Sequence, residues 1–503
     1  MKQRKISNFS FIMSVLGSGI GLGSIWGFPT KMVKYGGLAF LIPFLVAIFV
    51  LGVPILAYEI TLGSKMRFSH IFIFEKYHKK QGRIFGWWIS IAQFVTSSYY
   101  IILNVFVVVS LLSFIFKISN IGFLNSSFRE EEISENFGWT SLLNPGDHKT
   151  FFFYFFVLLF VIFLTFIVLY KELDQGIAFV CKIIMPLLFI ILTFFFFFVF
   201  FLEGVEKKLS VLFSFKPEQI FSLDAWTSAF GQAFFMISLG TGIVIIFSTH
   251  SQKKQDSLKQ AWLIVISTLV IALQTTVIVA AMLSEDVYGE SGNKVMIVFL
   301  AFLKAFQELK IPWIPWITNL LAVLFYLGVF FAGFSSLIAL VEAVINPYIK
   351  VFKCERKKVL VFFLLGLLLC STFFIFQFGY FLIYSFDYFQ TGFFLPFLLF
   401  GEILLFNCNP VFCQKIFVLV KKNTTLNFLS LRSFKILFFY VFPAVLLVNF
   451  SLCFYKLLFA FFFIDLLKFV FSFSLIVIFI YYFLSYLIVR FLYKKQQKQV
   501  SLL

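Results

Sequence analysis

The stretch Gly17-Ser18-Gly19-Ile20-Gly21-Leu22-Gly23-Ser24 places four glycines in eight residues inside the first long apolar run of the chain. A glycine in a helix interior costs roughly 1 kcal/mol relative to alanine, so this stretch predicts a break in a helix. A second such stretch, Ser238-Leu239-Gly240-Thr241-Gly242, lies within the sixth apolar run. Backbone freed from helical bonding inside a bilayer must bind protein, water or an ion. Close helix packing through small residues is the alternative, but two breaks five spans apart favour a transporter with an inverted repeat.

The composition around these breaks is that of a membrane protein. Of the 503 residues 61% are apolar and 13% are charged, and phenylalanine alone occurs 82 times. In soluble domains about a quarter of the residues are charged. The composition therefore excludes a cytosolic enzyme, a disordered protein and a secreted disulfide scaffold. It predicts an all-α polytopic membrane protein.

Apolar runs of about twenty residues predict about twelve spans. Their approximate bounds are 9–31, 38–63, 84–116, 150–170, 176–202, 225–250, 258–284, 316–349, 358–376, 379–406, 433–455 and 462–493. We assign residues 9–202 to the first five helices, 225–406 to the next five as the inverted repeat, and 433–493 to the last two. Residues 1–8 and 494–503 are the terminal segments.

The net charge of +18 is explained by topology, because lysine and arginine gather in loops on the cytoplasmic side. With the N-terminus inside, the predicted inner loops carry the basic clusters. The predicted outer loop near 119–149 carries the acidic residues Glu130, Glu131, Glu132 and Glu135. We therefore expect a cell-membrane protein with both termini in the cytoplasm and no nucleic-acid partner. The cysteines form no CxxC pair, so neither a zinc site nor an outer-loop disulfide is expected.

Several motifs resemble the neurotransmitter:sodium symporter family. The run from Ser18 through Trp26-Gly27-Phe28-Pro29 resembles that family's first-helix signature. Further matches follow in the family's order at 36–43, 52–59, 182–186, 231–240 and 331–336, so the resemblance covers roughly residues 5–410. It implies the LeuT fold, with a 5+5 inverted repeat and broken helices one and six, in a divergent member of bacterial type.

The resemblance implies a Na⁺ site between helices one and eight. Its ligands are the carbonyls of Gly17, Ile20 and Ala332 and the hydroxyls of Ser335 and Ser336. Hard cations take oxygen ligands, so all five positions are chemically competent. A buried serine pair can also bond back to carbonyls of its own helix, so the residues alone leave that alternative open.

A second Na⁺ site of the family is expected to be weak or absent. The matching positions are Gly19, Ser24, Met236 and Thr268. The family has asparagine at the positions of Ser24 and Thr268 and a hydroxyl residue at that of Met236, whose thioether is a soft ligand. We therefore expect coupling to one Na⁺, with no organic cofactor. The chloride-linked positions are also altered, since Ala272 accompanies Gln232.

The resemblance also implies a substrate pocket at the two breaks. Amides at a broken helix end lie at a positive half-helix end and bind carboxylates. Gly21 stands where carriers of monoamines have aspartate, which favours a substrate with its own carboxylate, such as an amino acid. The implied pocket residues are Gly19, Gly21, Leu22, Gly23, Thr96, Tyr100, Phe235, Ser238, Thr241 and Leu340.

Both gates of the family are altered. At the outer gate Gly27 replaces an arginine, while its partner matches Asp387. At the inner gate Lys2 or Arg4 could supply the cation, but Lys350 stands near the acidic position.

Two intramembrane acids, Glu59 and Glu342, are functional candidates by default. We expect Glu59 to hold the unwound backbone of helix six. Glu342 is either a structural partner of a polar group or a proton carrier.

Together these features predict a sodium-coupled symporter that imports an amino acid by alternating access, as a monomer or weak homodimer in the lipid bilayer. A substrate sensor and a proton-coupled transporter remain the alternatives. The four histidines are scattered as His70, His78, His148 and His250, with no catalytic motif, so an enzyme is not expected.

Overall fold

The computed structural model describes residues 5–116, 148–252, 256–282, 315–376, 394–407, 409–422 and 436–463. It also describes residues 302, 305–306, 382–383, 386–387, 389–390, 483 and 490. Within these residues the secondary structure is helical, apart from one antiparallel bridge between Gly37 and Phe215. The predicted outer loop lies almost wholly outside them.

In this part of the chain seven helical segments are long and apolar enough to cross a membrane, or eight if one bent pair counts as a span. This confirms the polytopic α-helical prediction. The count of twelve and the inverted repeat stay predictions, since most of residues 377–393 and 464–503 lie outside the description. The first segment, Leu38–Met66, consists of α3 (Leu38–Leu45), η2 (Val46–Gly52) and α4 (Val53–Met66). The others are α5 (His70–Phe116), Phe151–Tyr170 of α7 (His148–Tyr170), Ile177–Phe201 with α8 (Ile177–Phe198) and η4 (Val199–Phe201), α12 (Ser257–Met282), Ile317–Phe352 of α15 (Pro315–Phe352), and Arg356–Ile375 with α16 (Arg356–Thr372) and η6 (Phe373–Ile375).

The first predicted break is present. Helix α1 (Asn8–Gly19) ends at Ile20, whose φ of −83° and ψ of 74° leave the helix. After a π-helical turn, η1 (Gly23–Gly27), the chain continues as α2 (Phe28–Lys34), and the two halves are bent by 72°. At its start, α1 is capped by the Ser7 hydroxyl, which accepts the Ser10 N–H at 3.1 Å.

The second predicted break is also present. Helix α10 (Leu223–Met236) and helix α11 (Ile243–Thr249) are separated by residues in which φ is positive at Ser238 (54°), Gly240 (68°) and Gly242 (74°). Glycine adopts such angles freely, whereas a serine rarely does. Gly240 also passes close to Leu399, because a Cβ added there would lie 3.3 Å from the Leu399 backbone.

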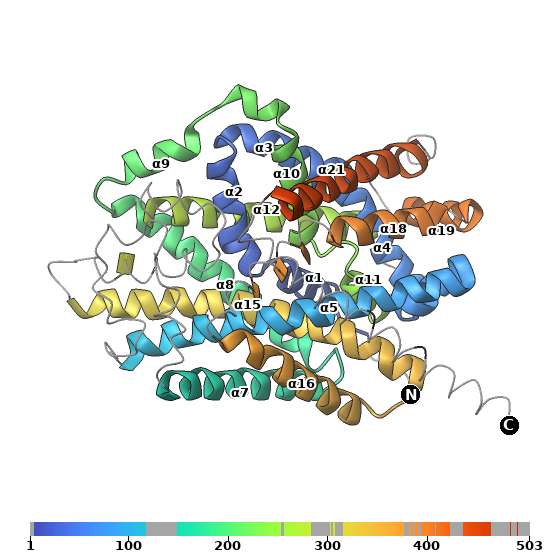
Figure 1. The fold of residues 1–503 in the computed structure, drawn as a ribbon, viewed down its shortest axis with the longest axis horizontal. Helices are drawn as coiled ribbons and strands as arrows, with labels where there is room; N and C mark the ends of the chain where they lie inside the picture. The colour runs from blue at the N-terminus through green and yellow to red at the C-terminus, as the bar shows by residue number, and fades with distance from the viewer. Residues whose placement is uncertain are drawn as a thin grey trace.

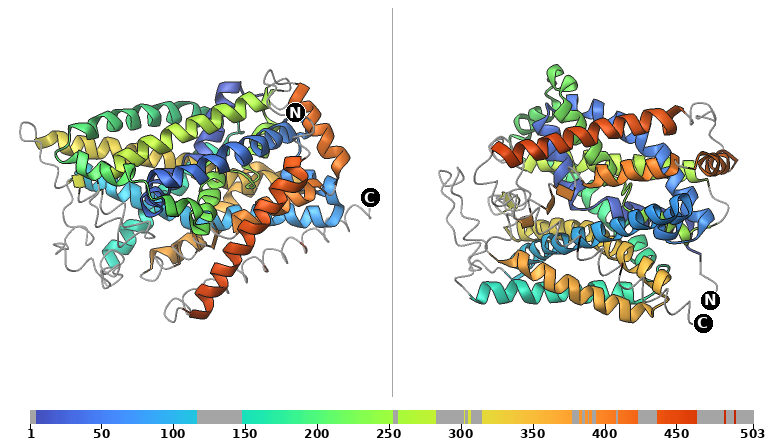
Figure 2. Two further views of the ribbon diagram at one scale, coloured as in Figure 1. Left: turned by 90° about the horizontal axis from the view of Figure 1, so that it is seen from above. Right: turned by 45° about the vertical axis from the view of Figure 1, so that its right-hand side comes forward.

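The spanning helices surround these two breaks (Figure 1). Helix α15 packs along α5, and α1 packs against α8 and α15, while α4 packs against α11 and α12. Figures 1 and 2 show α7 and α16 along one edge, with α21 (Phe442–Phe463) on the opposite side. Between these edges lie α18 (Leu395–Asn407) and α19 (Pro410–Lys422), with α9 (Val205–Phe213) at the periphery.

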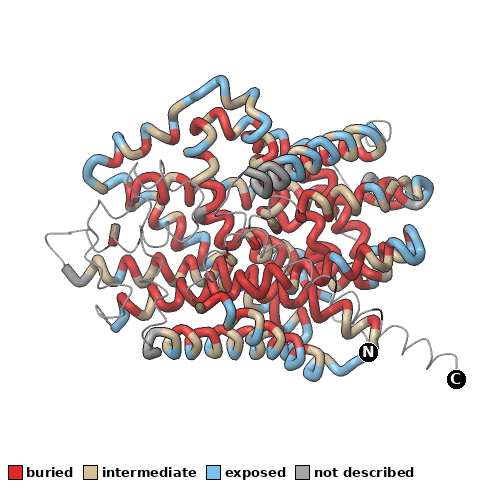
Figure 3. Tube along the Cα trace, in the orientation of Figure 1, coloured by how far each residue is buried: buried red, intermediate tan, exposed pale blue. Residues whose placement is uncertain are grey.

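Burial is greatest at the centre, around the breaks, and lowest on the outer helices (Figure 3). Helix α7 illustrates this pattern: Phe152, Phe156, Phe160 and Phe163 are exposed on one face, whereas Tyr154 is buried on the other. A face of this kind suits a lipid environment, which explains much of the phenylalanine excess without any aromatic site.

Candidate functional site

Two hydroxyl groups from α15 meet the end of α1. Ser335 Oγ and Ser336 Oγ each donate a hydrogen bond to the Gly17 carbonyl at 2.9 Å, and Ser335 Oγ also lies 3.0 Å from the Ala332 carbonyl. Ser335 and Ala332 are fully buried and Ser336 is nearly so. At Ile20 the helix ends, so carbonyls of the last turn lack partners within the helix. The result is a cluster of oxygens from two helices, the donor set that a hard cation requires.

Close approach at this point depends on Gly17. A Cβ added there would lie 3.0 Å from Cys181 Sγ and 3.2 Å from Ser335 Cβ. Larger residues would therefore separate the Gly17 carbonyl from the two hydroxyls.

Three members of the second set of predicted ion ligands, Gly19, Ser24 and Met236, lie together. Ser24 Oγ donates to the Gly19 carbonyl at 3.1 Å, and a side chain on Gly19 would overlap the Met236 carbonyl. The Thr268 hydroxyl is buried and has no hydrogen-bond partner among the described residues. Met236 brings a backbone carbonyl to the set and a thioether in place of a side-chain oxygen.

The predicted carboxylate site lies directly beside the first oxygen cluster. The Leu22 N–H donates to Tyr100 Oη at 2.8 Å. A side chain on Gly21 would overlap both Tyr100 Oη and Ser336 Oγ, so these groups adjoin one another. The Phe235 ring covers Gly23 so closely that a Cβ there would overlap it. A carboxylate in this position would meet a helix-end amide and a phenol next to the cation ligands.

The remaining pocket residues lie at the helix-six break and on helices α5 and α15. Ser238 Oγ lies 3.1 Å from Ser18 Oγ and so joins the two breaks, while Thr241 Oγ1 donates to the Ser238 carbonyl at 2.6 Å. Thr96 Oγ1 bonds back to Ala92 of its own helix at 2.9 Å. Leu340 is buried on α15, one helical turn beyond Ser336.

Glu59 contacts the break of helix six. Its Oε1 accepts the Gly240 N–H at 3.0 Å, a backbone donor freed because Gly240 lies outside any helix.

The comparison with a family model decides the identity of the fold. The model of the Sodium:neurotransmitter symporter family matches residues 3–142 and 153–494. The chain belongs to this family. Its members are transporters, as predicted, and not enzymes.

Individual relatives of the symporter agree with this assignment. A sodium-dependent transporter of Methanocaldococcus jannaschii is 28% identical over 386 residues, which cover 73% of this chain and 74% of that protein. A sodium-dependent transporter of Haemophilus influenzae is 26% identical, over 74% and 79% of the two chains. The crystal structure of MhsT in complex with L-phenylalanine matches with a TM-score of 0.75 at 20% identity, over 90% of this chain and 99% of that one. This match confirms the predicted LeuT fold.

At one end of the symporter, Lys31 lies between Gln232 and Asp387. Lys31 Nζ donates to Gln232 Oε1 at 2.7 Å, and Gln232 Nε2 donates to the Gly23 carbonyl at 2.9 Å. Lys31 and Asp387 attract each other electrostatically, and Tyr99 Oη donates to Asp387 Oδ1 at 3.2 Å. Lys31 lies four residues after Gly27 on the same face of the helix, a spacing from which it could have been predicted as the cation at this end.

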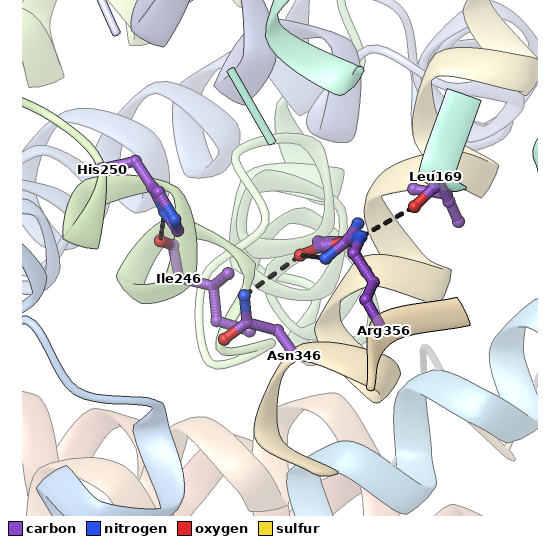
Figure 4. Close-up of polar contacts among 6 residues, drawn as sticks. Leu169, Ile246, His250, Asn346 and Arg356 are labelled. Atoms are coloured by element: carbon purple, nitrogen blue, oxygen red, sulfur yellow. Dashed lines mark hydrogen bonds and ion pairs between the residues drawn. The ribbon is translucent and has the colours of Figure 1, made fainter. Parts of the chain in front are cut away.

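At the opposite end, Glu342 pairs with Arg356, which the sequence analysis did not consider. Arg356 Nη1 and Nη2 donate to Glu342 Oε1 and Oε2 at 3.2 and 2.5 Å, and Arg356 Nε donates to the Leu169 carbonyl at 2.8 Å (Figure 4). Asn346 Nδ2 donates to Glu342 Oε1 at 3.1 Å. The buried Lys350 Nζ has no hydrogen-bond partner among the described residues.

Hydrogen bonds to backbone carbonyls just after α11 stabilise the same end. The Ile6 N–H donates to the His250 carbonyl at 3.0 Å, and Arg67 Nη2 donates to the Ser251 carbonyl at 2.9 Å. Lys2 and Arg4, the predicted cations of the inner gate, lie outside the described residues.

Proposed function

We propose that this protein is a symporter that imports an amino acid together with one Na⁺. The observation that carries this proposal is the meeting of Ser335 and Ser336 with the Gly17 carbonyl at the break of helix one. The two hydroxyls, with the carbonyls of Gly17, Ile20 and Ala332, would give Na⁺ five oxygens. An ion bound there would hold α1 against α15, which is how ion binding would favour one conformation over another.

The substrate is an amino acid bound through its carboxylate and its ammonium group. Gly21 leaves no room for an aspartate that would replace a substrate carboxylate, because Tyr100 Oη and Ser336 Oγ already adjoin it. The Leu22 and Gly23 amides with Tyr100 would receive the carboxylate. The carbonyls of Gly19 and Phe235, with Ser238, would receive the ammonium group. Leu340, Thr96 and Thr241 would form the walls. The L-phenylalanine in MhsT supports this substrate class.

Coupling uses one ion because the second set of ligands is depleted. Gly19 and Met236 offer carbonyls, and Ser24 and Thr268 offer single hydroxyls, but the thioether of Met236 adds no hard ligand.

Alternating access uses ion pairs at both ends. Lys31 with Asp387 would close the outer side, and Arg356 with Glu342 would close the cytoplasmic side. Glu59 would steady the helix-six break throughout. The protein would lie in the cell membrane with both termini in the cytoplasm, as a monomer or weak homodimer.

The test is uptake of a labelled amino-acid mixture into proteoliposomes, with an inward Na⁺ gradient or with choline replacing Na⁺. We expect accumulation only with Na⁺, abolished by the pair Ser335→Ala and Ser336→Ala. The matched control is Thr165→Ala, which removes a buried hydroxyl that bonds to the Val161 carbonyl of its own helix. Equal uptake with Na⁺ and with choline would favour proton coupling, and substrate binding without uptake would favour a substrate sensor.

A further inference from the structure

Two buried carboxyl groups beside the helix-six break have no counter-charge among the residues that the structure describes. Glu402 on α18 is fully buried, and neither of its oxygens has a hydrogen-bond partner among the described residues. Glu59 on α4 is equally buried, and its Oε2 also lacks a partner, while Oε1 binds the Gly240 N–H. No ion pair to either acid occurs within the described part of the chain.

The two acids converge on the same segment of backbone. The Glu402 carboxyl group interacts electrostatically with that of Glu59. Gly240, which donates to Glu59, also contacts Leu399 of α18, and Glu402 follows Leu399 by three residues on that helix. Glu59, Gly240 and Glu402 therefore form one site, assembled from α4, the helix-six break and α18.

The surroundings of this site are apolar and aromatic. Tyr58 and Tyr77, whose hydroxyls lie 2.9 Å apart, place their rings 4.6 and 5.1 Å from that of Phe406, one turn beyond Glu402. The other titratable groups at hand are Cys413 of α19, which interacts with Tyr58, and His70 of α5, whose ring contacts Gly242. His70 Nε2 is bound between the Gly86 carbonyl and Ser90 Oγ.

Burial of two like charges without a cation is strongly unfavourable. An isolated carboxylate in an apolar interior takes up a proton rather than remain charged, and a second carboxylate nearby strengthens that tendency. Such a pair titrates as a unit and shares its protons. Glu342 is different because Arg356 donates to both of its oxygens.

We propose that Glu59 and Glu402 form a proton-binding site, and that its proton exchanges with water as the helix-six break moves during transport. The proton would leave when the break opens the site to water on one face of the membrane, and another would bind from water on the opposite face when the site opens there. Through Glu59 and Gly240, protonation would control how firmly the break is held. The exchange part of this inference rests on the proposed transport function, whereas the protonation part does not.

Infrared spectroscopy of the full-length protein in liposomes tests protonation directly. At neutral pH exposed carboxyl groups are ionised, so the carbonyl stretch of a protonated carboxyl group reports buried acids. We expect this band, with its isotope shift in heavy water, in the wild type. It should be lost in Glu59→Gln with Glu402→Gln, and kept in the control Glu342→Gln, because Arg356 donates to both oxygens of Glu342.

Absence of the band from the wild type, or its survival in the double variant, would overturn the proposal. If the double variant fails to fold, Glu402→Gln alone removes one of the paired acids at nearly constant shape. The band must then weaken or shift, and an unchanged band would contradict the assignment.

Proton exchange is tested with a pH-sensitive dye trapped in the vesicles, using Na⁺-driven uptake of L-phenylalanine as the probe reaction. We expect a change of lumenal pH in step with uptake, and a ratio of protons to substrate that falls towards zero in Glu402→Gln. Uptake at constant lumenal pH would contradict exchange. Failure of all Na⁺-driven uptake would instead contradict the proposed symport and leave the infrared result standing.

Discussion

The two sets of candidate ion ligands differ in how many side-chain oxygens each set keeps. The set at helices one and eight keeps both of its hydroxyls, and both bind the Gly17 carbonyl at 2.9 Å. The set at helices one, six and seven keeps its carbonyls at Gly19 and Met236 but has only single hydroxyls at Ser24 and Thr268. Backbone carbonyls survive any substitution that preserves a helix break. An ion site built on such a break therefore weakens through its side chains while the fold stays intact.

Removal of both hydroxyls from the first set should have the largest effect. A hydrogen bond or comparable contact to a charged group contributes about 1.5–3 kcal/mol, so loss of two ligands should weaken Na⁺ binding roughly 100-fold or more. Na⁺ titrations of Ser335→Ala with Ser336→Ala, followed by intrinsic fluorescence, measure this. A Na⁺ affinity within a factor of about three of the wild-type value would show that Ser335 and Ser336 are not Na⁺ ligands.

A methyl group at Gly21 should be nearly as damaging, because it overlaps Tyr100 Oη and Ser336 Oγ together. We expect Gly21→Ala to reduce both Na⁺ and amino-acid binding by roughly tenfold or more, since it displaces one ligand of each. Equilibrium binding of both ligands measures it. Gly366→Ala is the control, because its new Cβ would lie 3.5 Å from Phe94 at an ordinary contact distance. If Gly21→Ala and Gly366→Ala bind Na⁺ and the amino acid equally well, Gly21 does not lie against the ligands of either site.

Restoration of side-chain oxygens to the second set should produce a gain. Met236→Thr with Ser24→Asn supplies one hydroxyl and one amide oxygen where hard ligands are missing. We expect a second Na⁺ to bind with an affinity improved about tenfold over the wild-type second set, equivalent to about 1.4 kcal/mol. The number of Na⁺ ions bound per protein, measured by equilibrium dialysis, decides this. If the number of bound Na⁺ ions does not change, the missing side-chain oxygens are not what prevents Na⁺ binding at this set.

The smallest effect is expected from Thr268→Val. Its hydroxyl is buried without a partner among the described residues, and its replacement by a group of the same shape should leave stability equal or slightly higher. Na⁺ affinity should change by less than about twofold, or about 0.4 kcal/mol. A clear loss of Na⁺ affinity, alongside a thermal-unfolding control, would show that Thr268 is an ion ligand.

Local features of the sequence predicted both helix breaks, because clustered glycines destabilise a helix even inside a long apolar run. The family resemblance then identified Ser335, Ser336 and Gly17, which the fold brings together. Lys31, Arg356 and Glu402 were overlooked for a common reason. Each has its partner on another helix, and helix packing, rather than spacing along one helix, decides which buried charge meets which partner.

The most direct test of the account is the number of Na⁺ ions bound per protein at saturation, measured with radioactive sodium on wild type and on Ser335→Ala with Ser336→Ala. The account predicts one ion for the wild type and none at the same concentration for the variant. Two ions in the wild type, or one ion retained by the variant, would contradict it.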